Sequence, residues 1–229
     1  MDIRLNYIEE GKGEPLVFLH GNGENQSYFR NQTAFFSRYY RVIAIDTRGH
    51  GDSPRGTAPF TLEQFADDLY AFLKEKQIIK TNILGFSDGG NTALYFALKH
   101  PGYINKLILN GANIYPGGVK RSAQLPIEIG YRIVSAFADI SPKARAKAEL
   151  LGLMVNEPDI CPEELKRITV PTLVIAGTRD MITKEHTELI HNSIPGSKIH
   201  YIEGDHFIAA KCSDEFNRVV LEFLQNSTR

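Results

Sequence analysis

Apolar residues gather in six short runs along the chain, each followed by polar or glycine residues. Within a run the Val, Ile, Leu and Phe residues are almost continuous instead of alternating with polar ones. Strands that are buried on both faces, as in a parallel sheet, have this pattern. We therefore expect parallel strands at PLVFLHG from residue 15, RVIAIDTRG from 41, TNILGFS from 81, KLILNGA from 106, PTLVIAG from 171 and SKIHYIEG from 197.

The segments between these runs have the periodicity of amphipathic helices. In one of them, Thr61 and Gln64 have the spacing of a capping box, and an apolar stripe follows at the spacing of helical turns. The alternating stretch 2–9 indicates an antiparallel edge strand. Helices are expected at 27–38, 61–76, 91–100, 184–193 and 214–225. This alternation predicts an α/β protein, a mostly parallel sheet with helices on both faces.

The alternation breaks once, between about residues 115 and 167. No strand pattern occurs there, and LPIEIGYRIVSAFADI and SPKARAKAELLGLM indicate two or three helices. Because the break follows a strand end, we expect a small helical cap over the carboxyl edge of the sheet, where ligands of α/β proteins bind. The expected organisation is a core of residues 1–114 and 168–229 with an inserted helical cap of residues 115–167.

Composition and charge narrow the class of partner. The 229 residues are 42% hydrophobic and carry a formal net charge of -1, so the chain has no electrostatic footprint for nucleic acid or an anionic membrane. The sequence shows no signal peptide and no apolar run long enough to span a bilayer. Cys161 and Cys212 lack metal or redox spacing and fit reduced thiols. We expect a cytoplasmic protein with a small-molecule substrate, and the oligomeric state stays open.

Gly85-Phe86-Ser87-Asp88-Gly89 has the G-x-S-x-G pattern, between a predicted strand and a predicted helix. That context is typical of a nucleophile elbow, in which the glycines let a strand reverse sharply into a helix and expose the serine. The alternative is a serine that caps a helix after a glycine-rich turn. Partners decide between the two, because a serine hydroxyl needs a base and an orienting carboxylate to become a nucleophile.

One of the seven histidines suits the base. His206 follows the last predicted strand and so lies at the same edge of the sheet as Ser87. Asp180 follows the preceding strand and is the favoured acid, ahead of Asp205 and Glu203. The chain order Ser87, Asp180, His206 is the order of nucleophile, acid and base expected when all three follow successive parallel strands.

Attack on an acyl carbon also requires N–H donors for the oxyanion. The turn His20-Gly21-Asn22-Gly23 ends the first buried strand, and we assign the backbone N–H groups of Asn22 and Asp88 to the oxyanion hole. The Asp88 side chain either stabilises the helix start or contacts a cationic group of the substrate. No cofactor is expected, and no metal, because His186 and His191 lack the i, i+4 spacing of two ligands on one helix face.

The HGNG turn, the DTRGHGDS stretch, the GFSDGG elbow and the AGTRD and GDHF segments occur in order, and together they resemble the α/β-hydrolase fold superfamily over nearly the whole chain. The resemblance implies a serine-hydrolase triad of Ser87, Asp180 and His206, an oxyanion hole at Asn22 and Asp88, and carboxylic-ester hydrolysis as the default activity. The sequence departs from the family in its short N-terminal segment, so we expect the family's first strand to be missing. Serine at the elbow argues against the epoxide hydrolases and haloalkane dehalogenases of this fold, which carry aspartate there.

The leading hypothesis is therefore hydrolysis of small-molecule carboxylic esters through an acyl-enzyme. Thioesterase, lactonase, perhydrolase and carbon–carbon hydrolase activities stay open, because the fold does not choose among them. A ligand-sensing or signalling protein with slow turnover, and a scaffold with a decayed site, are the alternatives of other classes. The residues expected to line the substrate pocket are Gly21, Gly23, Tyr115, Met181 and Phe207.

Overall fold

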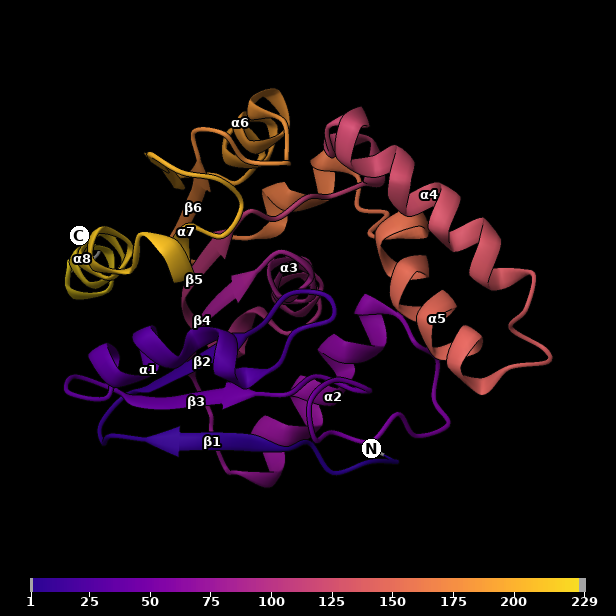
Figure 1. Ribbon diagram of the computed structural model, residues 1–229. Helices are drawn as coiled ribbons and strands as arrows, with labels where there is room; N and C mark the ends of the chain where they lie inside the picture. The colour runs from indigo at the N-terminus through magenta and orange to yellow at the C-terminus, as the bar shows by residue number, and fades with distance from the viewer. Residues whose placement is uncertain (1, 227–229) are drawn as a thin grey trace.

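All six apolar runs form strands, and a shorter strand precedes them. The computed structural model describes residues 2–226 and contains a seven-stranded sheet in the order β1-β3-β2-β4-β5-β6-β7 (Figure 1). Neighbouring strands are parallel except β1 with β3, which confirms the predicted α/β class and edge strand. The strands are β1 Tyr7–Glu10, β2 Pro15–Leu19, β3 Arg41–Ile45, β4 Thr81–Phe86, β5 Ile104–Asn110, β6 Thr172–Gly177 and β7 Lys198–Ile202.

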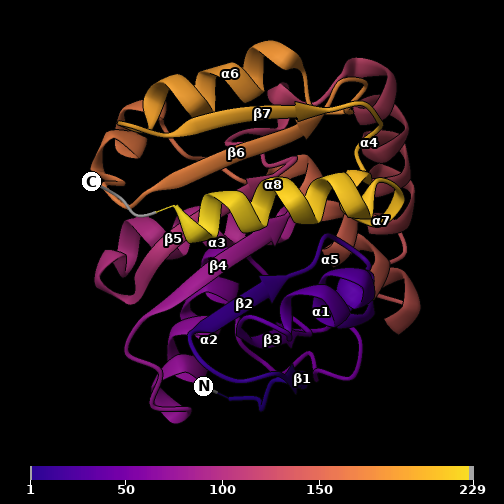
Figure 2. The ribbon, with the colours of Figure 1, turned by 90° about the vertical axis from the view of Figure 1, so that its left-hand side faces the viewer.

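Helices cover both faces of the sheet, so two apolar cores form. Figure 2 looks onto the face covered by α1 (Arg30–Phe36) and α8 (Ser213–Gln225), where Phe36 and Phe216 are buried against Phe18 of β2 and its neighbours. The helices α2 (Leu62–Glu75), α3 (Asp88–Lys99) and α6 (Lys184–Ser193) pack on the opposite face. Short helices lie at α7 Ile208–Lys211 and at the 3-10 turns Gln26–Phe29, Pro101–Tyr103, Pro116–Gly118 and Pro162–Arg167.

Two expectations need correction, the start of one helix and the burial of one strand. The helix expected from residue 91 begins at Asp88, because the chain enters α3 directly from the turn at Ser87. The last strand, β7, was expected to be buried on both faces, yet most of its residues are only partly buried. It is an edge of the sheet, so one side of it has no neighbouring strand. The predicted cap at Thr61 is confirmed, since its hydroxyl accepts a hydrogen bond from Gln64 N–H at 3.1 Å.

Between β5 and β6 two helices replace the usual crossover helix, as the sequence pattern indicated. They are α4 (Arg121–Ser135) and α5 (Pro142–Asn156). In both views they lie beyond the edge toward which the parallel strands point (Figures 1 and 2). The segment before α4 pairs with the loop after β6: Val119 forms an antiparallel bridge with Ile182, and Lys120 N–H donates to Met181 O at 2.8 Å. The inserted helices are thus attached directly to the loop that carries Asp180.

Candidate active site

The strand-to-helix turn at Ser87 is as sharp as the motif predicts. Ser87 has φ 52° and ψ -121°, and within residues 2–226 the only other non-glycine residue with positive φ is Gln77. A Cβ at Gly85 would lie 2.3 Å from Gly89 O, and a Cβ at Gly89 would lie 2.0 Å from Leu19 O. Since such contacts are sterically forbidden, the strained backbone of Ser87 depends on both glycines.

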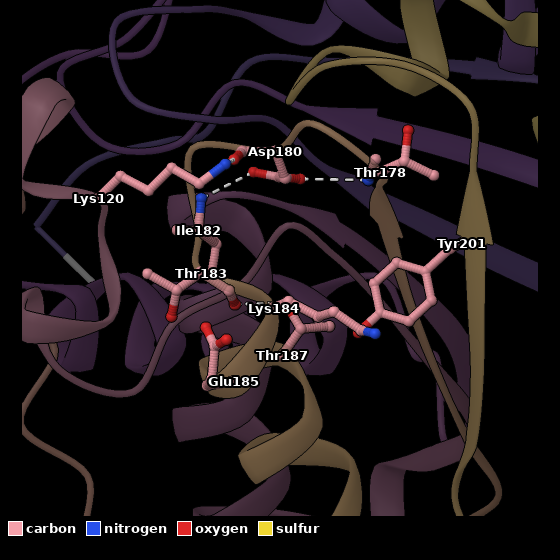
Figure 3. A pocket seen from close by; sticks show the side chains of 10 residues that line it. Lys120, Thr178, Asp180, Ile182, Thr183, Lys184, Glu185, Thr187 and Tyr201 are labelled. Atoms are coloured by element: carbon pink, nitrogen blue, oxygen red, sulfur yellow. Dashed lines mark hydrogen bonds between the residues drawn. The ribbon is translucent and has the colours of Figure 1, made fainter.

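Asp180 and His206 form a buried pair near this turn. His206 Nδ1 lies 2.6 Å from Asp180 Oδ1, and the two residues are 6% and 3% exposed. The Asp180 carboxylate also accepts hydrogen bonds from Ile182 N–H at 2.9 Å and Gly177 N–H at 3.4 Å (Figure 3). These bonds fix the carboxylate and the imidazole plane, and they leave Nε2 as the ring nitrogen available for proton transfer.

Ser87 and His206 both lie beside the residues at the end of β5. Ser87 N–H donates to Asn110 O at 2.8 Å, and the position of a Cβ on the next residue, Gly111, would lie 2.8 Å from His206 Cε1. The ring of Phe86 lies 4.8 Å from the imidazole, between centroids. Parallel strands thus bring residues from the ends of β4 and β6 and the loop after β7 together at one edge.

The two other acid candidates are engaged elsewhere. Asp205 pairs with Lys211 and accepts a hydrogen bond from Phe207 N–H. Glu203 accepts from Thr178 and pairs with Arg179 on the surface. The carboxylate that contacts His206 is therefore that of Asp180.

The loop after β2 places two backbone N–H groups beside the turn. His20 fixes this loop: its Nδ1 lies 2.7 Å from Gly21 O, and its Nε2 accepts from Thr47 N–H at 3.0 Å. Burial lowers the pKa of His20 to about 4, so the ring is neutral and can make both bonds at once. Within residues 2–226 the backbone N–H groups of Asn22 and Asp88 donate to no protein acceptor. They are therefore free to bind an oxyanion.

The side chains of the same two residues are joined. Asn22 Nδ2 donates to Asp88 Oδ2 at 2.9 Å and to Leu150 O of α5 at 2.8 Å, and Asn91 Nδ2 lies 3.3 Å from Asp88 Oδ1. Burial raises the pKa of the Asp88 carboxyl, although both amides oppose the shift. Asn22 thus connects the loop after β2 with both the elbow and the inserted helices.

Ser87 and Asp88 line a small cavity of about 40 Å³. Sequence reasoning found Met181, which lines this cavity, and Gly21, whose Cβ position lies 3.3 Å from Ser87 Cβ. The other three residues expected in the pocket, Gly23, Tyr115 and Phe207, are not among those that line this cavity. Tyr115 packs edge-on against His186 at 4.5 Å between ring centroids. Gly23 has nothing within 4 Å of its Cβ position. Phe207 is 39% exposed and packs against Phe86 at 5.7 Å.

Several lining residues were missed. Gln124, Ile127 and Met154 come from the inserted helices, and Glu157 from the segment that follows them. Glu157 accepts a hydrogen bond from Leu62 N–H at 2.7 Å, and burial, with the nearby Asp88 charge, raises its pKa. The sequence pattern indicated helices in this segment, but only the folded chain shows that α4 reaches the cavity at Ser87.

A larger groove, of about 490 Å³, adjoins the acid loop from another side. It is lined by Asp180, Thr183 and Tyr201 and lacks both Ser87 and His206 (Figure 3). At its rim Lys120 Nζ donates to the backbone oxygen of Asp180. Despite its size, this groove is lined by only one of the three predicted triad residues, Asp180.

Other site types find little support. Within residues 2–226, no group of three or more His, Cys, Asp or Glu side chains is arranged to bind a metal ion. No helix in that range has the length and apolar character needed to cross a membrane. Cys161 and Cys212 are free thiols.

Comparisons with known proteins identify the family. The model of the alpha/beta hydrolase fold matches residues 14–151. The human serine hydrolase BPHL is 30% identical, with 97% of this chain and 84% of that protein covered. The 3-oxoadipate enol-lactonase 2 of Acinetobacter baylyi is 29% identical, with 96% of this chain and 92% of that protein covered. The enol-lactonase structure from Burkholderia xenovorans LB400 has a TM-score of 0.83 at 23% identity over 98% of this chain and 97% of that one. The chain belongs to the α/β-hydrolase fold family.

Proposed function

We propose that the protein is a serine hydrolase that cleaves carboxylic esters of small molecules through an acyl-enzyme. Ser87 is the nucleophile, His206 the base and Asp180 the residue that orients the base. The observation that carries the proposal is the buried Asp180–His206 pair, 2.6 Å between Oδ1 and Nδ1, next to a serine with φ 52°.

The reaction follows from this arrangement. Ser87 Oγ attacks the ester carbonyl while His206 Nε2 takes the hydroxyl proton, and the Asp180 carboxylate stabilises the imidazolium. The N–H groups of Asn22 and Asp88 stabilise the charge on the carbonyl oxygen. His206 then gives the proton to the departing alcohol, and water hydrolyses the acyl-enzyme by the same steps. No cofactor is needed.

The site favours a small acyl group. The cavity at Ser87 is small, about 40 Å³. Residues 115–167 act as a cap that covers this cavity, and residues 1–114 and 168–229 form the core beneath the cap. The lining of the cavity combines apolar side chains from the cap and the loop after β6 with the carboxyl groups of Asp88 and Glu157.

The free thiols of Cys161 and Cys212 support a reducing compartment, the cytoplasm.

Lactone hydrolysis is the second candidate. A lactone is a cyclic carboxylic ester, so the same groups would open it. The 29% identity to an enol-lactonase over 96% of the chain supports this candidate.

A substrate panel tests the proposal. Aryl esters of increasing acyl length and simple lactones are offered to the wild type and to Ser87→Ala. We expect turnover that is fastest for short acyl groups and falls at least ~10⁴-fold in the variant, because the members of such a triad act as a unit. Turnover that survives in Ser87→Ala would refute the proposal. Wild-type enzyme without turnover on the whole panel would refute it in favour of a ligand sensor.

A further inference from the structure

Helix α4 has two apolar faces, of which the described structure covers one. The inner face packs on α5, brings Ile127 into the Ser87 cavity, and lets the Gln124 amide donate to Met154 O at 3.0 Å. The outer face runs along the helix and the hydrogen-bonded turns after it. It consists of Leu125, Ile129, Ile133, Phe137 and Ile140, which are 42%, 50%, 57%, 52% and 79% exposed.

This outer face is continuous. Leu125, Ile129 and Ile133 recur every four positions and share one side of the helix, and Phe137 and Ile140 follow in the turns after it. Figure 1 shows α4 as the outermost element on its side of the molecule, with α5 between it and α2. The five side chains expose roughly 500 Å² of apolar surface, near the upper end of the patches found on monomeric proteins. Neither the packing of the core nor the chemistry at Ser87 accounts for it.

We propose that the outer face of α4 is the interface of a homodimer, in which α4 packs antiparallel against α4 of a second copy. Two such faces would together bury about 1,000 Å² before flanking side chains are counted, which is where specific interfaces begin. The four-residue spacing provides ridges that interdigitate between two identical helices. A two-fold axis near Ile129 and Ile133 would place these two residues of each copy at the centre.

Charge at the ends of the face favours the antiparallel arrangement. Arg121 lies at the start of α4, where its side chain is 68% exposed and pairs with Glu128, whereas Asp139 lies beyond the end, fully exposed and 3.9 Å from Arg145. An antiparallel pair brings the Arg121 end of one copy toward the Asp139 end of the other, twice, while a parallel pair would bring like charges together. Residues 121–140 contain two basic and two acidic residues, which suits a protein partner better than the basic face of a membrane-binding helix.

The dimer would have a consequence for the cavity. Since the inner face of the same helix carries Gln124 and Ile127 to Ser87, contact on the outer face would restrict the movement of α4. This consequence rests on the proposed function, whereas the dimer itself does not.

Sedimentation velocity over a range of micromolar concentrations tests the dimer. The wild type is expected to dimerise, and Ile129→Glu/Ile133→Glu to raise the dissociation constant at least ~100-fold, because central apolar residues dominate such interfaces. Ile79→Glu is the matched control, since Ile79 is 81% exposed and lies outside the face; it should dimerise like the wild type. Circular dichroism checks that all three are folded. A wild type that stays monomeric, or a double variant that dimerises unchanged, would overturn the proposal.

Charge reversal tests the orientation. Arg121→Asp and Asp139→Arg should each weaken the dimer, and the two together should restore it to within ~3-fold of the wild type. A combined variant as weak as the single ones would rule out the antiparallel pair. Co-sedimentation with phosphatidylcholine–phosphatidylglycerol vesicles tests whether the outer face of α4 binds a lipid surface instead of a second copy. Vesicle binding by a monomeric wild type, lost in Ile129→Glu/Ile133→Glu, would replace the second copy with a lipid surface.

Discussion

His206 Nδ1 and Asp180 Oδ1 lie 2.6 Å apart, although 26 positions separate the two residues in the chain. Two backbone N–H groups, those of Ile182 and Gly177, hold the carboxylate that makes this bond. The pair thus fixes both the tautomer and the direction of the imidazole, the two properties that a general base for Ser87 requires.

Replacement of Asp180 by Asn should remove that control of the tautomer. We expect kcat to fall ~10³–10⁴-fold while the protein stays folded, as for the equivalent change in other triads. Steady-state hydrolysis of an aryl ester measures the effect. Asp205→Asn is the control: that carboxylate pairs with Lys211 at the surface, so its loss should leave kcat nearly unchanged. Equal losses in the two variants would contradict the assignment of the acid.

Asn22→Ala should reduce kcat/KM, because the side chain of Asn22 holds the loop after β2 in place through its hydrogen bonds. The Asn22 side chain bridges Asp88 and the α5 backbone. Its removal frees the loop whose N–H group we propose as an oxyanion donor, and it leaves Asp88 with fewer donors. We expect a loss of about 1–3 kcal/mol in transition-state stabilisation, seen as a fall in kcat/KM. Asn105→Ala, which removes a surface contact to Glu14, serves as control. Unchanged kinetics in Asn22→Ala would argue against a role for this loop.

Gly89→Ala should destabilise the whole fold. The added methyl group would lie 2.0 Å from Leu19 O, and neither backbone segment can yield without disturbing β2 or α3. We expect the free energy of unfolding to drop by ~3 kcal/mol or more, measured by urea denaturation. At Gly102 the same methyl group would meet nothing within 4 Å, and Gly102→Ala should be close to the wild type. Similar stability in the two variants would show that the turn is looser than described.

His186 should make the stability depend on pH. Its Nε2 accepts a hydrogen bond from Ile114 N–H at 3.0 Å, and burial lowers its pKa from 6.5 to about 4. A lowered pKa means that the neutral ring stabilises the folded state above about pH 6.5, and that this stability is lost as the pH falls toward about pH 4.

The comparison of wild type with His186→Gln isolates this effect. Glutamine can accept the same bond but does not titrate, so the decline in unfolding free energy should be shallower by up to about 1.4 kcal/mol per pH unit over that range. Other buried groups, including Asp88 and His20, titrate equally in both proteins and cancel. Parallel pH curves for the two proteins would contradict the prediction.

The sequence could predict the parts of the site that depend on strand ends. Ser87, Asp180 and His206 each follow a continuous apolar run, and parallel strands bring such positions to one edge whatever the remaining contacts are. Strand order was not readable, so the partial exposure of β7 was missed.

The parts that depend on long-range packing could not be predicted. The bond from Asn22 to Leu150 O spans 128 positions, and the contribution of Gln124 and Glu157 depends on how the inserted helices fold back. Tyr115 was expected in the pocket, and its ring packs on His186. Local pattern does not determine which side of an irregular loop faces the site.

Labelling with a fluorophosphonate, followed by peptide mass spectrometry, tests the central claim most directly. If His206 and Asp180 make Ser87 a nucleophile, the wild type should carry one adduct per chain on the peptide that contains Ser87, and His206→Gln should carry almost none. An unlabelled wild type, an adduct on another residue, or equal labelling of Ser87 in His206→Gln would contradict the account.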